Sequence, residues 1–335
     1  MRDVELTTVT ESEAVFHDGS VVHRLDGLAP DTEHTHAGIT FRTLARPAGE
    51  LLARFATVND VHFGEFEAGK IDDLTEGPIQ RSAPGEAPYP ETMNRGALAE
   101  LTAAGIEALV VKGDLSNSGL DEEWAAFEAC YRPRFGRQLY VVRGNHDAYQ
   151  GQDAYAGDQR IEFPGAIVAL LDTVVPEHTN GRLTADQLAW LDALAAEADR
   201  PVLAMGHHPQ WTDGSRSPDH FGMNPDDSDA LAELIARRTA IVSYSAGHTH
   251  RHRVRLLECG APTIEVGCVK DYPGTWVEHR VYEGGIMHVV HRISTPEALS
   301  WSERCRHLYR DFGVDYAEYA LGRLEDRCFL INLRS

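Results

Sequence analysis

Hydrophobic and polar residues alternate in two short segments near the beginning of the chain. Residues 4–9 and 39–44 both have this period of two, which is typical of strands that bury one face. Gly27 and Pro30 lie in the turn-rich segment between them. We therefore predict that residues 1–47 form an N-terminal β extension.

From residue 48 the pattern changes to apolar runs that alternate with amphipathic segments. Helices are predicted at residues 93–104, after Asp121, and after Thr184, which forms a capping box with Gln187. The apolar runs predict strands at residues 51–58, 108–112, 138–143, 166–171, 201–205, 240–245, 253–257, 262–266 and 287–293.

Strands that alternate with helices indicate a single α/β domain, and 335 residues are enough for one large domain with small extensions. The proline and glycine of the segment 46–50 suggest a boundary. We predict that the domain occupies residues 48–295. A polar helical tail is predicted from Pro296, over residues 296–335.

Five of the predicted strands end in a short motif of His, Asp or Asn residues, and four of these motifs contain glycine. The carboxyl ends of strands in an α/β sheet gather at one edge, where sites form. We therefore expect the five motifs to converge in space. They are Asn59-Asp60-Val61-His62, Gly113-Asp114, Gly144-Asn145-His146-Asp147, Gly206-His207-His208-Pro209 and Gly247-His248-Thr249-His250.

The residue types in these motifs suit a metal centre. Imidazoles and carboxylates bind Zn, Mn and Fe ions. Two cations about 3.5–4 Å apart need a bridging anion, and Asp114 is the natural candidate. Each motif alone is weak, because a lone histidine at a strand end is more often a surface or core residue. The ordered combination of all five at strand ends favours metal binding.

Charge and composition limit which molecules the chain is expected to bind. The chain has 52 acidic residues against 31 Lys and Arg, a net charge of -21, so long nucleic acid is disfavoured as a partner. A small phosphate ester remains compatible, because bound metal ions invert the local field. We expect neither a secretory signal nor a membrane span in this chain. Its five scattered cysteines fit a reducing compartment, and we predict a cytoplasmic protein.

The five motifs together resemble those of the calcineurin-like metallophosphoesterases, over roughly residues 51–295. The class III cyclic-nucleotide phosphodiesterases are the most similar subgroup, by the segments 113–119 and 187–191 and by the doubled histidine before Pro209. This resemblance implies a four-layer α/β/β/α sandwich. Residues 27–34 also resemble the corner of a fibronectin type III domain, with His34 where a tyrosine usually stands; a plain β-ribbon is the alternative.

The resemblance also implies roles for individual residues. Two divalent or trivalent metal ions (Mn, Fe or Zn) are expected, with Asp114 as the bridging ligand. The first metal would be held by Asp60, His62 and His250, and the second by Asn145, His207 and His248. The implied catalytic residues are His146, which faces the phosphate, together with Asp114 and Asn145.

The predicted reaction is hydrolysis of a phosphate ester by in-line attack of a metal-bridging hydroxide. A phosphodiesterase for cyclic nucleotides or small diesters is the favoured enzyme. A broad-range phosphomonoesterase on the same scaffold is one alternative. A metal-binding module without catalysis is another, although no ligand position of the family is lost.

One position departs from the family. Many relatives have an aspartate three residues after the bridging aspartate, which orients and charges the motif histidine. This chain has Asn117 there, so His146 is expected to act more as a hydrogen-bond donor than as a strong general acid. The role of the adjacent Asp147 is open. Asn117 also excludes the tyrosine-ligated iron site of purple acid phosphatases.

Two long turn-rich segments, residues 64–90 and 209–225, are candidates for substrate contacts. Their aromatic residues could stack on a nucleobase and Arg216 could pair with a phosphate, although packing on the domain is equally compatible. The residues considered are Phe63, Phe66, Tyr89, Trp211, Arg216, His220 and Phe221. The tail aromatics Trp301, Tyr309, Phe312, Tyr316 and Tyr319 could cap the site, form a homodimer contact or pack in the core.

Overall fold

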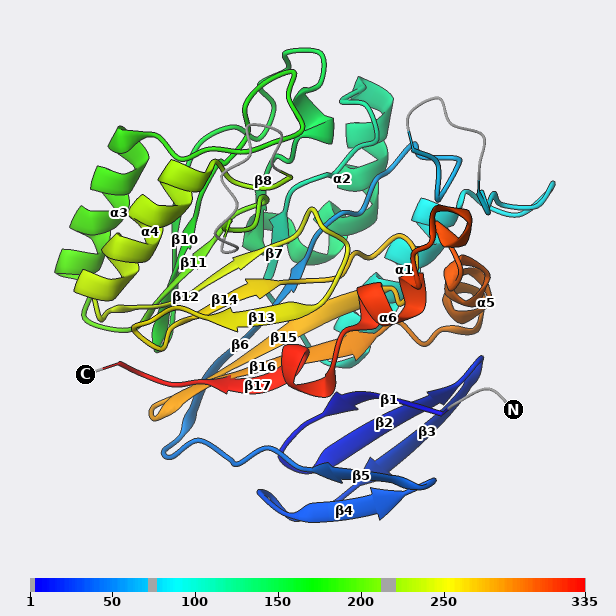
Figure 1. Cartoon of the computed structure of the whole chain (residues 1–335), viewed down its shortest axis with the longest axis horizontal. Helices are drawn as coiled ribbons and strands as arrows, with labels where there is room; N and C mark the ends of the chain where they lie inside the picture. Colours follow the sequence, from blue (N-terminus) through cyan, green and yellow to red (C-terminus); the bar gives the residue numbers. More distant parts are fainter. Residues whose placement is uncertain (1–3, 72–76, 212–220, 335) are drawn as a thin grey trace.

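The computed structural model of the protein describes residues 4–71, 77–211 and 221–334. Two six-stranded sheets face each other, helices cover their outer faces, and the N-terminal strands lie beside one of them (Figure 1). In the described part of the chain, no helix combines the length and the apolar character that crossing a bilayer requires.

The first sheet contains the first three predicted strands of the α/β domain. Its order is β17-β16-β15-β6-β7-β8, and β6, β7 and β8 run parallel. β15 joins β6 antiparallel. The strands are β6 (Leu51–Val58), β7 (Leu109–Lys112), β8 (Leu139–Val142), β15 (Thr275–Tyr282), β16 (Gly285–Arg292) and β17 (Cys328–Ile331).

The second sheet has the order β13-β14-β12-β11-β10-β9. Its four central strands β14, β12, β11 and β10 are parallel, and the edge strands β13 and β9 are antiparallel to their neighbours. The strands are β9 (Gln159–Phe163), β10 (Ala166–Leu170), β11 (Val202–Met205), β12 (Ile241–Ala246), β13 (Arg253–Leu256) and β14 (Pro262–Glu265).

Three hydrophobic cores separate the four layers. One lies between the first sheet and helices α1 (Tyr89–Ala103), α2 (Asp121–Phe135) and α5 (Pro296–Cys305). Another lies between the two sheets. The third lies between the second sheet and helices α3 (Ala185–Glu197) and α4 (Pro225–Arg237). The predicted four-layer α/β/β/α sandwich is confirmed.

The N-terminal extension packs against strands β15, β16 and β17 of the first sheet. Strands β1 (Glu5–Val9), β2 (Glu13–Asp18) and β3 (Val21–Asp26) form one sheet, and β4 (Glu33–His36) pairs with β5 (Ile39–Arg42). A shared hydrophobic cluster joins these strands to β15, β16 and β17. The buried Arg327 guanidinium donates to the carbonyls of Leu6 and Thr7. The domain boundary at residue 47 stays a prediction.

The prediction omitted some elements. Strand β15 was missed because its sequence is interrupted by the buried Glu278, His279 and the neighbouring Arg280. The Glu278 carboxylate is compatible with burial because Arg54 and Arg280 donate to it. Helix α1 begins four residues before the predicted start. The predicted helical tail contains helices α5 and α6 (Tyr316–Leu321). It also contains strand β17, which was not predicted. Strand β9 and helix α4 were also not predicted.

A buried histidine makes the fold sensitive to acid. His279 lies between the sheets, where its ring stacks on Phe55 at 4.8 Å and neither ring nitrogen has a hydrogen-bond partner. Burial lowers the pKa of His279 to about 3, whereas an exposed histidine has a pKa of about 6.5. Below about pH 6.5 the unfolded chain therefore binds more protons than the folded one. As a result, the free energy of unfolding decreases as the pH falls from about 6.5 toward 3.

We predict that His279→Phe weakens this pH dependence, because phenylalanine keeps the stacked ring and cannot bind a proton. Between pH 7.5 and pH 5 the free energy of unfolding should fall by about 2 kcal/mol less in the variant than in the original chain. Urea unfolding at both pH values measures this. His307→Gln at an exposed position is the control, and equal pH slopes in all three proteins would contradict the prediction.

Candidate metal centre

The five predicted motifs meet at the carboxyl ends of strands from both sheets. Strands β6, β7 and β8 of the first sheet lead into the motifs of Asp60, Asp114 and Asn145, and β11 and β12 of the second lead into those of His207 and His248. The ligand atoms of overlapping groups lie within 4.8 Å of one another. These groups include Asp60, His62 and His250; Asp60, Asp114 and His207; and His62, Asp114 and His146.

The Asp114 carboxylate has a central place in this arrangement. Its Oδ2 lies 3.4 Å from His62 Nε2 and 3.3 Å from His207 Nε2. On one side, His250 Nε2 lies 3.4 Å from Asp60 Oδ1. On the other, His207 Nε2 lies 3.0 Å from Asn145 Oδ1. One buried carboxylate thus faces imidazoles from both predicted ligand sets.

The backbone at these motifs is strained. Asp60, His62, Asp114, His248 and His250 all have positive φ angles, between 47° and 70°. Residues other than glycine rarely adopt this conformation, which costs on the order of 1 kcal/mol or more each. Local hydrogen bonds hold it in place. The strain is concentrated at five of the seven predicted ligands, which supports a functional role for them.

Two of the predicted glycines are required by close packing. A Cβ atom on Gly144 would overlap the carboxylate of Asp114, and one on Gly113 would overlap the ring of His207. Gly113 also has φ +87°, a value that glycine adopts without strain. Glycine at these two positions thus allows the backbone to approach the site closely.

The polar atoms at the site fit a bound cation. His207 Nδ1 donates to the carbonyl of Lys112 (2.8 Å), so in the neutral ring Nε2 carries a lone pair. That lone pair faces Asn145 Oδ1 and Asp114 Oδ2, which are also acceptors. The amide of Asn145 is turned this way because its Nδ2 donates to Tyr149 Oη. Converging acceptors need a proton or a metal ion between them.

Unpaired nitrogens lead to the same conclusion. Both ring nitrogens of His62 and Nε2 of His248 are buried without a hydrogen-bond partner, an arrangement that is costly unless a ligand binds them. Imidazole nitrogens with carboxylate and amide oxygens form a donor set for Zn, Mn or Fe. The residues present therefore fit metal ions.

The electrostatics show how protons and metal ions would compete. Burial alone would lower the pKa of His207, but the carboxylates of Asp114 and Asp60 and the hydrogen bond to the Lys112 carbonyl together raise that pKa to about 9. Burial lowers the pKa of His62 to about 4. The pKa of Asp114 is held well below its usual range, because His207 and His146 outweigh the effect of burial. Metal uptake at neutral pH would therefore release a proton from His207.

His146 is oriented by the main chain and not by a side chain. Its Nδ1 donates to the carbonyl of Asn117 (2.8 Å), whereas the Asn117 side chain donates to Ser118 Oγ. The amide side chain at position 117 therefore does not orient this imidazole. Its backbone N–H donates to Asp114 Oδ1 (3.0 Å), and its ring lies edge-on to His62 at 4.5 Å.

Asp147 does not take the place of the missing aspartate. Its buried carboxylate accepts hydrogen bonds from the backbone of Leu115, Ser116 and Gly144 and from the Ser116 hydroxyl. It therefore fastens the motif after β8 to the loop after β7. The second histidine of the doubled pair is also structural, because His208 Nδ1 contacts the Thr173 hydroxyl and Nε2 contacts the Thr179 carbonyl.

The aromatic residues considered for substrate contact have different positions. Phe63 and Tyr89 are buried in the core. Phe66 is exposed, and Phe221 is 53% exposed while its ring stacks on His248 at 4.2 Å. Trp211 is partly buried. Arg216 and His220 lie outside the described residues. Phe221 is thus the candidate whose ring touches a predicted ligand.

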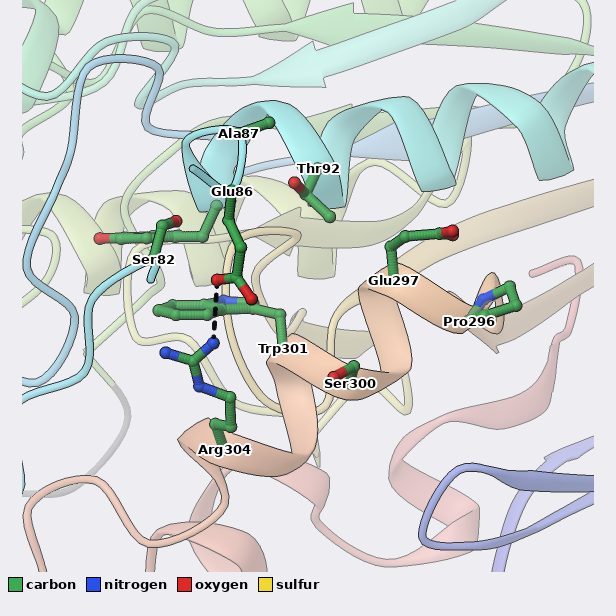
Figure 2. A pocket seen from close by; sticks show the side chains of 10 residues that line it. Ser82, Glu86, Ala87, Thr92, Pro296, Glu297, Ser300, Trp301 and Arg304 are labelled. Atoms are coloured by element: carbon green, nitrogen blue, oxygen red, sulfur yellow. Dashed lines mark hydrogen bonds and ion pairs between the residues drawn. The ribbon is translucent and has the colours of Figure 1, made fainter. Parts of the chain in front are cut away.

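A separate pocket of about 450 Å³ lies between the N-terminal end of α1 and helix α5 (Figure 2). Arg304 lies over the ring of Trp301 and pairs with Glu86 (3.2 Å). Trp301 also stacks on Tyr89 at 4.1 Å. None of the predicted ligands lines this pocket. Trp301 and Tyr316 belong to the core beside α1, in agreement with core packing of the tail.

Some residues around the site were not predicted. The buried Lys112 donates to the Ser245 hydroxyl and the Ala246 carbonyl of β12. Asp271 contacts His250 from the C-terminal side, and Tyr316 in turn donates to Asp271. Tyr319, which like Tyr316 is one of the tail aromatics considered for capping the site, donates to the carbonyl of Thr249. Of the two that were not predicted, Lys112 is one polar residue at the end of an apolar strand, and Asp271 lies outside the five motifs. No local pattern marks them.

Residues 53–252 match the family model described as calcineurin-like phosphoesterase. The chain belongs to this family. The resemblance found from the motifs is therefore confirmed, and the family places the chain among the metal-dependent phosphoesterases. The match contains all seven predicted ligands and ends two residues after His250.

Curated proteins share part of this sequence. A probable cyclic nucleotide phosphodiesterase of Synechococcus sp. is 28% identical over 151 residues, which are 43% of this chain and 58% of that protein. A glycerophosphodiester phosphodiesterase of Enterobacter lignolyticus is 27% identical over 159 residues, which are 43% of this chain and 56% of that protein. The matched parts span between 40% and 58% of the curated relatives' lengths.

A solved structure shares the fold. A dimetal phosphatase from Danio rerio covers 72% of this chain and 97% of its own, with a TM-score of 0.53 and 18% identity. At this identity the likeness supports the α/β sandwich alone.

We predict that Asp114→Ala lowers both the bound metal and the turnover of an aryl phosphodiester. The variant lacks the carboxylate between His62 and His207. We expect metal affinity and turnover each to fall by more than about 100-fold, because about 100-fold is the upper range for residues that contact a metal ligand without binding the metal. Metal analysis and a chromogenic assay measure the two effects. Asp192→Ala on the surface of α3 is the matched control. Unchanged turnover in Asp114→Ala would favour the non-catalytic interpretation.

Proposed function

We propose that the chain is a two-metal phosphodiesterase that hydrolyses cyclic nucleotides or other small phosphodiesters. The observation that carries the proposal is the position of Asp114 Oδ2, within 3.4 Å of imidazole nitrogens from both ligand sets. A carboxylate in this position can be shared between two cations. Mn, Fe or Zn ions suit the nitrogen and oxygen donors.

The proposed ligand sets follow the contacts. His250 Nε2 beside Asp60 supports a first metal held by Asp60, His62 and His250. The contact of His207 with Asn145, together with the edge-to-face rings of His207 and His248, whose centroids lie 5.1 Å apart, supports a second set. That set consists of Asn145, His207 and His248.

When bound, two such ions would activate water and neutralise charge on the phosphoryl oxygens. The chain's own contribution is to place ligands and one further imidazole. Because Nδ1 of His146 donates to the Asn117 carbonyl, its Nε2 is left to meet the substrate. This nitrogen can donate a hydrogen bond to a phosphoryl oxygen when it is protonated. Among the described residues, no carboxylate accepts a hydrogen bond from Nδ1 of His146 to stabilise the imidazolium, because the Asn117 carbonyl is its partner.

The substrate class is supported from two sides. The curated relatives carry the names of diesterases, one for cyclic nucleotides and one for glycerophosphodiesters. The half-exposed ring of Phe221 against His248 offers a surface on which a nucleobase could stack. The net charge of -21 disfavours long nucleic acid. The cytoplasmic location and the homodimer stay predictions.

A substrate panel with added Mn²⁺ tests the proposed class. It compares an aryl phosphodiester, an aryl phosphomonoester, a glycerophosphodiester, and 3′,5′- and 2′,3′-cyclic nucleotides at equal concentrations. We expect the diesters to be hydrolysed faster than the monoester, and kcat/KM decides the order among the diesters. Faster turnover of the monoester would replace the proposal by the phosphomonoesterase alternative.

We predict that His146→Ala slows diesters with good and poor leaving groups to a similar extent, by about 100- to 1000-fold. The reason is that His146 is oriented by a carbonyl and acts on the phosphoryl group. Measured kcat for a nitrophenyl diester and an alkyl diester checks this. A loss confined to the alkyl leaving group would instead identify His146 as the general acid. Asn117→Ala, which keeps the carbonyl, is the control and should remain within a few-fold of the original chain.

A further inference from the structure

The ring of His250 lies between two carboxylates. Its Nε2 faces Asp60 Oδ1 at 3.4 Å, on the side of the metal centre. Its Nδ1 faces Asp271 Oδ2 at 3.9 Å, on the opposite side. Asp271 Oδ2 is buried and has no hydrogen-bond partner among the residues that the structure describes. A buried acceptor without a donor, aimed at the outer nitrogen of a ligand, needs an explanation.

The other oxygen of Asp271 is held firmly. Oδ1 accepts from the Tyr316 hydroxyl (2.8 Å) and from the Cys268 thiol (3.1 Å). All three side chains are buried. The carboxylate is therefore fixed with Oδ2 toward His250 by one donor from the C-terminal helix α6 and one from the loop after β14.

These residues do not form a third metal site. His250, Cys268 and Asp271 are close enough to hold an ion, but the Lys270 ammonium lies 3.9 Å from Asp271 Oδ2 and repels a cation there. Burial raises the pKa of the Cys268 thiol well above its usual range, so the thiolate needed for a metal bond is disfavoured. The Lys270 charge is balanced by Glu65, whose carboxylate oxygens lie 2.6 Å away.

Helix α6 contacts the motif of His250 at further points. The Tyr319 hydroxyl donates to the carbonyl of Thr249 (2.9 Å), which lies between the ligands His248 and His250. The backbone N–H of His252 donates to the carbonyl of Ala320 (3.0 Å). Asp271 and α6 both lie after residue 252, where the match to the family model ends. The C-terminal tail, which lies outside the matched region, thus packs against the loop that carries His248 and His250.

The two metal sites differ in how their histidines are oriented. On the second side, His207 Nδ1 donates to a backbone carbonyl, that of Lys112. On the first side, the corresponding partner of His250 is a carboxylate. A carboxylate that accepts from Nδ1–H leaves the Nε2 lone pair for the metal and makes the ring a stronger ligand.

We propose that Asp271, held by Tyr316 of helix α6, is a positioning residue for His250: it accepts a hydrogen bond from Nδ1 and directs Nε2 toward the first metal. The inference rests on the proposed two-metal centre. It gives the C-terminal tail a function in metal binding that differs from capping the substrate site.

Mn²⁺ titration of the metal-free full chain tests the proposal, with binding followed by calorimetry and by electron paramagnetic resonance. In Asp271→Asn we expect the affinity of one of the two sites to fall about 10- to 100-fold, the effect typical of a lost partner of a ligand, while the other site keeps its affinity. Tyr316→Phe should weaken the same site less. Tyr309→Phe is the matched control, because Tyr309 packs on Tyr316 at 5.1 Å and lies outside the Asp271 hydrogen bonds.

The outcomes separate this proposal from the proposed function. Two sites of original affinity in Asp271→Asn would overturn the positioning role, and so would an equal loss at both sites. If Asp271→Asn does not fold, as judged by circular dichroism, Tyr316→Phe decides by the same criteria. An original chain that binds fewer than two Mn²⁺ ions would overturn the two-metal centre itself.

Discussion

The site exists because the carboxyl ends of two separate sheets are held against each other, and Lys112 is one of the residues that join them. Its ammonium donates to Ser245 and Ala246 at the end of β12, and its carbonyl accepts from the ring of His207 after β11. A fully buried lysine is costly, since burial lowers its pKa to about 7, although the Asp60 carboxylate opposes the shift. The contacts place the next residues, Gly113 and Asp114, between the two sheets.

The charge of Asp114 explains much of the structure around it. A carboxylate with 1% exposure needs compensating groups, and the chain supplies imidazoles from both sheets together with the N–H of His146. The strained backbone at five ligands then follows from geometry, because short loops must turn their side chains inward within a few residues. Positive φ angles at Asp and His are the local cost of this convergence.

The segments outside the matched region complete the same structure. The N-terminal strands bury the outer side of β16 and β17 through one hydrophobic cluster, and the tail returns along the molecule to add β17 to the first sheet. Between these two anchors, α6 lies against the loop of His248 and His250. The tail thus connects the edge strand of the first sheet with the metal centre.

The sequence by itself determined the class of fold, the seven candidate ligands and the family. It could do so because apolar runs and strand-end motifs are local patterns, and parallel strands must bring their carboxyl ends together. The tertiary structure decided that the ends come from two sheets, that a backbone carbonyl at Asn117 orients His146, and that Asp271 reaches His250. It also decided that β15, with the charged Glu278 inside, is a central strand. These features depend on contacts between distant residues, and such contacts leave no periodic or local mark in a single sequence.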